Sequence, residues 1–113
     1  MKQQSFHSGL TSERWEQLSL LEQLGNIGSE VGRALKAKEQ GNTQRLEGAL
    51  DRALELFDLT LADPKHRGPR LRELCRTREV LCDFFFGENE YKSTGESLDQ
   101  YFFAFALAAR SGK

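Results

Sequence analysis

Apolar residues recur at three- and four-residue steps in four separate segments of this chain, which is the spacing of one face of an α-helix. The four segments cover about residues 12–38, 43–62, 69–86 and 94–109. No stretch alternates apolar and polar residues as a half-buried strand does. A chain of 113 residues is long enough for one modest core. We therefore predict an all-α fold, a four-helix up-down bundle that forms a single domain over residues 1–113, with residues 1–10 as a flexible arm.

Turn and capping residues lie between these segments. Gly41 suits the position after a helix end, and Asn42 suits the cap of the next helix. Pro69 suits the first position of the segment 69–86. Ser93 and Glu96 match a capping box, so we expect Ser93 to cap the last helix.

The first helical segment contains Gly25, Gly28 and Gly32 on or beside its apolar side. Each glycine in a helix interior costs about 1 kcal/mol relative to alanine. We expect the missing side chains to let another helix approach closely, with a kink or a ligand against the backbone as the alternatives. The spacing is not that of a phosphate loop, because no strand precedes it and no Lys-Ser/Thr follows.

A single charged residue, Arg78, lies in the middle of the apolar stripe of the segment 69–86. The stripe consists of Leu71, Leu74, Cys75, Leu81, Cys82 and Phe85. An unpaired guanidinium is very costly to bury. Arg78 is therefore expected to have one of two roles. In the first it is structural, and it forms an ion pair or reaches solvent at a subunit seam. In the second it binds an anion in a cleft. We expect Asp99 as its first partner and Glu30 as its second.

Two groups of polar residues are candidate binding residues. Asn26, Glu30 and Arg33 form a column on the polar side of the first helix. This column is typical of solvated surface, and a subunit contact or the polar wall of a cleft are the alternatives. The second group lies on the segment 69–86 and the loop after it, and consists of Arg76, Arg78, Glu79, Asp83 and Tyr91. Its charges suit a surface ion-pair ladder as well as a polar site.

The one basic concentration of the chain is the segment 65–78, with Lys65, Arg67, Arg70, Arg72, Arg76 and Arg78. It can pair with the acidic side of the segment 43–62, which carries Glu47, Asp51, Glu55 and Asp58. Alternatively, it binds RNA or another anion. The formal net charge of −1 argues against binding of nucleic acid or membrane over the whole surface.

Catalytic and metal-binding patterns are scarce. Cys75 and Cys82 lie about 10 Å apart along one helix, too far for a disulfide. We expect two buried, reduced thiols, which suits a cytoplasmic protein. The chain has no CxxC or HExxH motif, and no signal peptide or membrane span is expected. We predict no cofactor and no metal, and a protein that is not an enzyme.

The segment 94–109 is apolar almost all round, and we expect it to contribute to a homo-oligomer interface. The favoured hypothesis is a non-enzymatic helical interaction module that self-associates. The alternative is an anion-, nucleotide- or RNA-binding accessory protein that uses the segment 65–78.

Three stretches carry a resemblance to known proteins: NIGSEVGRA (26–34), RALELFDLTLADP (52–64) and RELCRTREVLCDFFFGENEYKST (72–94). Together they resemble a family of uncharacterised small prokaryotic all-helical proteins, which implies a fold but no activity. More remotely, the helix order is similar to HEPN-type bundles and to bundles that accompany nucleotidyltransferases. Ribonuclease members of that group carry an Arg followed a few residues later by a His on one helix. Neither His7 nor His66 follows an Arg in this way, so the resemblance does not imply ribonuclease activity.

Overall fold

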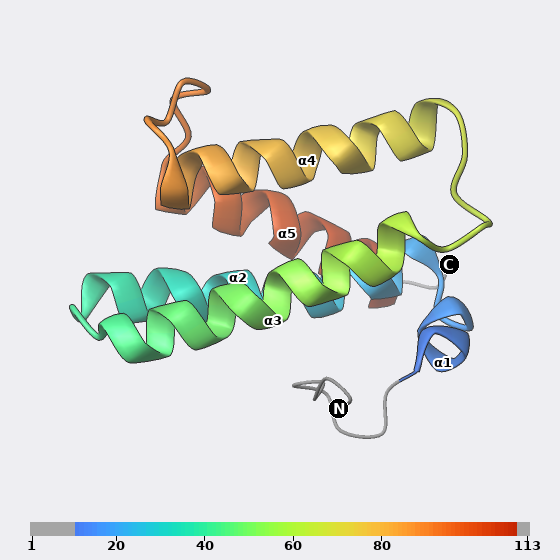
Figure 1. The fold of residues 1–113 in the computed structure, drawn as a ribbon, viewed down its shortest axis with the longest axis horizontal. Helices are drawn as coiled ribbons and strands as arrows, with labels where there is room; N and C mark the ends of the chain where they lie inside the picture. Colours follow the sequence, from blue (N-terminus) through green and yellow to red (C-terminus); the bar gives the residue numbers. More distant parts are fainter. Residues whose placement is uncertain (1–10, 111–113) are drawn as a thin grey trace, which may run out of the picture.

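The structure, a computed structural model, describes residues 11–110, without the side chains of residues 105, 106 and 108–110. The described chain is all-helical and forms five helices (Figure 1). They are α1 (Ser12–Glu16), α2 (Leu20–Glu39), α3 (Thr43–Leu61), α4 (Pro69–Phe86) and α5 (Gly95–Arg110). The all-α prediction is confirmed for these residues, while the predicted flexible arm, 1–10, lies outside them.

The first predicted helix is divided in two, so the prediction of one helix over 12–38 is wrong in this respect. The α1 helix ends at Glu16, and α2 begins after Ser19. Ser19 Oγ accepts a hydrogen bond from the Glu22 N–H, and Glu22 Oε1 accepts one from the Ser19 N–H. This capping box starts a new helix, and its direction differs from that of α1.

The predicted turn between α2 and α3 is confirmed. Gly41 has φ +70°, a backbone conformation that glycine adopts without strain. Asn42 caps α3, because its Oδ1 accepts a hydrogen bond from the Arg45 N–H. At α5 the cap lies one residue later than predicted: Thr94 Oγ1, not Ser93, accepts from the backbone of Ser97.

The α2 helix is central to the packing and lies against both α3 and α5. Residues at the core include Leu24, Ile27, Val31, Leu56, Phe57 and Phe102. The rings of Phe57 and Phe102 meet edge to face, with centroids 6.5 Å apart. The α4 helix contributes Leu74 and Leu81 as its fully buried residues.

The predicted close crossing occurs at Gly28. A Cβ atom built on Gly28 would lie 2.6 Å from Phe102 Cβ, a distance that real contacts do not reach. The missing side chain therefore lets the Phe102 side chain of α5 lie directly on the α2 backbone. Gly32 faces the same helix, with Asp99 Oδ1 3.7 Å from the corresponding position.

Candidate functional site

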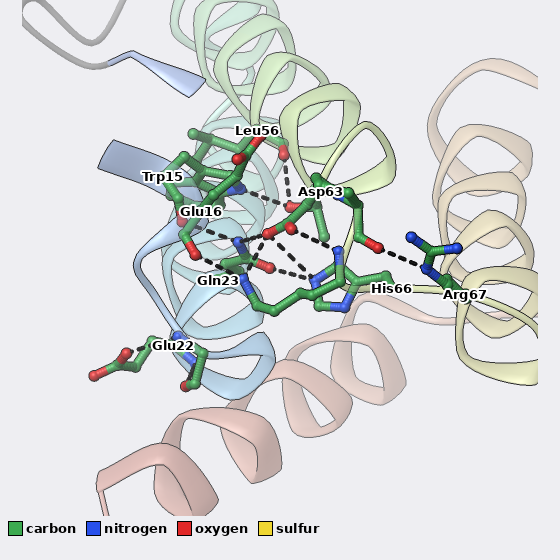
Figure 2. A network of polar contacts seen from close by, with 12 residues as sticks. Trp15, Glu16, Glu22, Gln23, Leu56, Asp63, His66 and Arg67 are labelled. Atoms are coloured by element: carbon green, nitrogen blue, oxygen red, sulfur yellow. Dashed lines mark hydrogen bonds and ion pairs between the residues drawn. The ribbon is translucent and has the colours of Figure 1, made fainter. Parts of the chain in front are cut away.

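A buried cluster of polar side chains joins α1, α2, the end of α3 and the loop after α3 (Figure 2). We call it the polar clasp, and it consists of Trp15, Gln23, Thr60, Asp63, Lys65 and His66. Five of its members are almost fully buried, while the Lys65 side chain is partly exposed. Buried polar groups are costly unless they are hydrogen-bonded, so the contacts of each member decide what the cluster does.

Gln23 is the centre of the polar clasp. Its Nε2 donates hydrogen bonds to the Trp15 carbonyl, at 3.0 Å, and to Asp63 Oδ2, at 2.9 Å. Its Oε1 lies 2.8 Å from His66 Nε2. One side chain of α2 thus holds both α1 and the loop after α3. Gln23 is fully buried, because α1 and the loop after α3 cover it.

Asp63 carries the negative charge of the polar clasp. Its Oδ2 accepts a hydrogen bond of 2.6 Å from Lys65 Nζ, and its Oδ1 accepts one of 3.0 Å from the Lys65 N–H. Burial by itself raises the pKa of this carboxyl. The hydrogen bonds from Lys65 and Gln23, together with the Lys65 charge, outweigh burial and lower the pKa of Asp63 to about 2.

His66 is held in its neutral form. Gln23 Oε1 can only accept, so His66 Nε2 carries the proton, and Nδ1 has no hydrogen-bond partner among the described residues. Burial lowers the pKa of His66, and the nearby positive charges of Lys65 and Arg70 add to this effect. The Asp63 carboxylate, 3.8 Å away, opposes it and is outweighed.

The remaining contacts fasten α1. Trp15 Nε1 donates a hydrogen bond of 3.0 Å to Thr60 Oγ1, which in turn donates to the Leu56 carbonyl. Lys65 Nζ also donates to the Glu16 carbonyl at the end of α1, at 2.8 Å. The side chains of His66 and Asp63 are 0% and 2% exposed, so no solute reaches either group in this structure. The geometry therefore suits a structural joint rather than proton transfer to a substrate.

Sequence reasoning missed Trp15, Asp63 and His66 as members of one cluster. The signal that was available is local: Asp63 and Lys65 are two residues apart in a turn, and the His66 N–H donates to the Asp63 carbonyl. Gln23 lies 40 residues from its partner Asp63, and Trp15 lies 45 residues from its partner Thr60. No helical period indicates that these residues meet.

The predicted column of Asn26, Glu30 and Arg33 is only partly solvated. Asn26 is exposed, and its Nδ2 donates to the Glu22 carbonyl. Glu30 is buried and binds Arg33 at 3.1 Å and Arg52 of α3 at 3.0 Å. The column thus contains a carboxylate shared by two arginines of neighbouring helices.

The second predicted group is divided between three places, and Arg78 is described in the next paragraph. Arg76, Glu79 and Tyr91 line one open cavity of about 650 Å³ on the outer side of α4. The Arg76 guanidinium lies over the Tyr91 ring, 5.8 Å from its centroid. Asp83 has a structural role instead, because its carboxylate accepts hydrogen bonds from the backbone of Glu90 and of Tyr91. It thereby orders the loop between α4 and α5.

Arg78 faces α3, not α5. Its Nε lies 3.4 Å from Asp58 Oδ1, so the expected partners Asp99 and Glu30 are both wrong, while pairing with the acidic side of α3 is found. This Nε makes no hydrogen bond of good geometry among the described residues. Asn26, Glu30 and Arg78 therefore do not meet, because Glu30 binds Arg52 and Arg78 binds Asp58.

We expect Arg78→Met to change the free energy of unfolding by less than about 1 kcal/mol, because Asp58 is 66% exposed and exposed ion pairs contribute little. The change also removes a buried donor without a hydrogen bond, which favours a neutral or slightly stabilising result. Urea unfolding followed by circular dichroism measures the difference. The matched variant is Asp58→Asn. A loss of more than about 2 kcal/mol would show that Arg78 has a larger structural role than this ion pair.

The basic segment 65–78 is partly used inside the chain. Lys65 belongs to the polar clasp, and Arg67 Nε donates to the Pro64 carbonyl. Arg70 and Arg72 are exposed and have no ion pair within residues 11–110. Binding of RNA at this segment stays a prediction.

The two cysteines differ from expectation. Cys75 is exposed and Cys82 is half-buried, and both are free thiols. Both lie on α4, of which neighbouring helices bury only Leu74 and Leu81 completely. The apolar stripe of the sequence is therefore wider than the buried face of the helix.

Three further findings bear on function. Among the described residues, no three or more His, Cys, Asp or Glu side chains gather as a metal ion requires. The helices of the described chain lack the combination of length and apolar character needed to cross a membrane. Comparison of the chain with protein-family models, curated proteins and solved structures gives no match.

Proposed function

We propose that this chain is a non-enzymatic helical interaction module that associates with a second copy of itself through α5. In this proposal the four long helices act as an up-and-down bundle, and α1 is an attachment held by the polar clasp. The observation that carries the proposal is the exposure of Phe103, which is 61% in the single chain. Leu107, four residues later on the same side of α5, is 41% exposed.

The rotation of α5 is fixed by the core, so Phe103 stays outside. Leu98 and Phe102 are buried, and Phe102 lies against the backbone of α2 at Gly28. Turning the helix to bury Phe103 would remove Phe102 from that contact. An apolar ring held at the surface in this way gains free energy when a second surface covers it.

A second copy is the occupant that the features of the chain favour. In a symmetric dimer the same patch faces itself, so one apolar surface suffices for both partners. The net charge of −1 produces little repulsion between copies. Asp63 and His66 of the polar clasp are buried, which argues against a catalytic site there. The exposed side of α5 is therefore the better candidate for a functional surface.

We expect Phe103→Glu to shift the protein from dimer to monomer, because it places two carboxylates in the proposed interface. Size-exclusion chromatography with light scattering, from low to high micromolar concentration, measures the mass. The matched control is Gln17→Glu, which adds the same charge at an exposed position outside α5 and should leave the dimer intact. A wild-type chain that is monomeric at the highest concentration would disprove self-association.

The alternative function is that of an anion-, nucleotide- or RNA-binding accessory protein that uses the segment 65–78. Exposed Arg70 and Arg72 support it, while the internal contacts of Lys65 and Arg67 weaken it. We therefore rank it second.

A further inference from the structure

A groove of about 600 Å³ lies where the end of α2 meets the start of α3. This end of the helix pair is remote from α1 (Figure 1). Four of its ten lining residues are cationic and none is acidic. The cationic residues are Arg33 and Lys36 of α2 and Arg45 and Arg52 of α3. The groove is separate from the polar clasp, from the exposed side of α5 and from the segment 65–78.

The positive charge of the groove is only partly balanced. Glu30 is the carboxylate that binds Arg33 and Arg52, and one negative charge serves both guanidinium groups. Lys36 and Arg45 have no side-chain ion pair with any residue of the described chain. Because Glu30 is buried, it holds the two arginines in position while leaving an excess of positive charge at the groove.

The groove is hollow because its helices carry small residues there. Ala37, Gly48 and Ala49 line it. A Cβ atom added at Gly48 would meet only the Arg52 guanidinium, at 3.5 Å. The α3 helix also begins at this groove, and the dipole of its N-terminus adds to the positive potential.

We infer that this groove binds a small polyanion with two or more linked phosphate groups. Its volume is that of a small-molecule site. Four cations in one groove suit several negative charges held close together, and arginine binds phosphate in a bidentate manner. The lining contains no aromatic side chain on which bases of single-stranded nucleic acid stack, so a small phosphorylated molecule fits better than RNA.

The amide side chains of Gln40, Asn42 and Gln44 line the same groove. They can donate and accept hydrogen bonds. They could therefore contact a sugar or base attached to the phosphates, so inorganic polyphosphate and a nucleoside triphosphate are two sources of the same chemistry. This inference does not depend on association through α5.

Isothermal titration of the full chain at low salt tests the inference, with inorganic triphosphate, ATP and orthophosphate as the three probes. Triphosphate should bind at least about tenfold more tightly than orthophosphate, because further charge-assisted contacts form. If ATP binds as tightly as triphosphate, the groove recognises the phosphates alone. If ATP binds more tightly, the amide side chains also contact the attached nucleoside. Absence of triphosphate binding at low salt would overturn the inference.

Two double variants locate the binding. Lys36→Ala with Arg45→Ala should weaken triphosphate binding by at least about tenfold, since both side chains are free to contact the ligand. The matched control, Arg70→Ala with Arg72→Ala, removes the same charge from the segment 65–78 and should change affinity by less than about twofold. Equal losses in the two double variants would show a general charge effect, and a larger loss in the control would place the site on α4. Either result overturns the inference.

A substitution at Gly48 separates binding from folding. Both Gly48→Ala and Gly48→Glu should raise the thermal midpoint, because glycine is a poor residue for a helix interior. Gly48→Glu also puts a carboxylate into the groove and should abolish triphosphate binding, whereas Gly48→Ala should retain it. Binding by a folded Gly48→Glu variant as tight as that of wild type would overturn the inference.

Discussion

Gly28→Ala is expected to lower the free energy of unfolding by about 2 kcal/mol, although alanine is the better helix former. The added methyl group would lie 2.6 Å from Phe102 Cβ, an atom that moves only with the backbone of α5. Overpacking of this kind costs about 1 to 3 kcal/mol. A shift of α5 would also disturb the edge-to-face contact between Phe102 and Phe57.

The same substitution at Gly48 is the matched control, and the expected sign is opposite. The new methyl group at Gly48 meets only the end of the flexible Arg52 side chain. Gly48→Ala should therefore raise the free energy of unfolding by up to about 1 kcal/mol. Urea unfolding of both variants measures the two effects. A Gly28→Ala variant as stable as Gly48→Ala would contradict the close approach of α5 to α2.

Asp63→Asn is expected to lower the free energy of unfolding by about 2 to 3 kcal/mol near neutral pH. The pKa of Asp63 is about 2 in the folded chain, against 3.8 as the ordinary value. Each unit of difference corresponds to about 1.4 kcal/mol in favour of the folded state when the carboxyl is ionised. Asparagine keeps the shape of the side chain but cannot hold the charge that Lys65 and Gln23 bind.

The same pKa values predict how stability varies with pH. The Asp63 contribution is complete above pH 3.8 and is lost as the pH falls towards 2. His66 has a pKa below 6.5 when folded, so the unfolded chain takes up its proton first, and stability already begins to fall below pH 6.5. In Asp63→Asn, the decline in stability below pH 6.5 should remain. The further decline from pH 3.8 towards 2, which Asp63 causes in the wild type, should be absent.

Urea unfolding at a series of pH values measures both effects. Asp51→Asn is the matched control, because Asp51 is an exposed carboxyl of α3 without an ion pair among the described residues. It should leave stability almost unchanged. If Asp63→Asn behaved like Asp51→Asn, the polar clasp would contribute nothing to the fold.

Apolar periodicity was sufficient to predict the four long helices, and the residue types of Gly41 and Asn42 were sufficient to predict the turn. Both features depend on residues that are close together in the sequence. The glycines of α2 also predicted a close crossing, although only the structure identified Phe102 as the contacting residue. The break before α2 was missed because apolar residues continue on both sides of it, as Leu18 and Leu20 show. The signal was nevertheless present, since Ser19 and Glu22 have the spacing of a capping box.

The polar residues were harder to predict than the apolar ones. A helical period separates two faces of one helix but does not show which neighbour covers each face. The column that contains Glu30 was interpreted as solvated surface, yet α3 supplies Arg52 as a partner for this carboxylate. Gln23 gave no signal in the sequence, and its partner Asp63 is known only from the structure. Arg78 was correctly identified as a charge that needs a partner, but the choice between α3 and α5 depended on packing that the sequence does not contain.

The way in which α1 is fastened has a consequence for the order of folding. A helix of five residues has almost no stability by itself, because nucleation costs more than so few hydrogen bonds return. Apart from the Trp15 carbonyl, which accepts a hydrogen bond from Gln23 of α2, the contacts of Trp15 and Glu16 are to Thr60 and Lys65. Thr60 and Lys65 come together only when α3 and the following loop have formed. The α1 helix is therefore synthesised before α3 and the following loop but is fastened only after they have formed, and its amide protons should exchange with solvent whenever that loop opens.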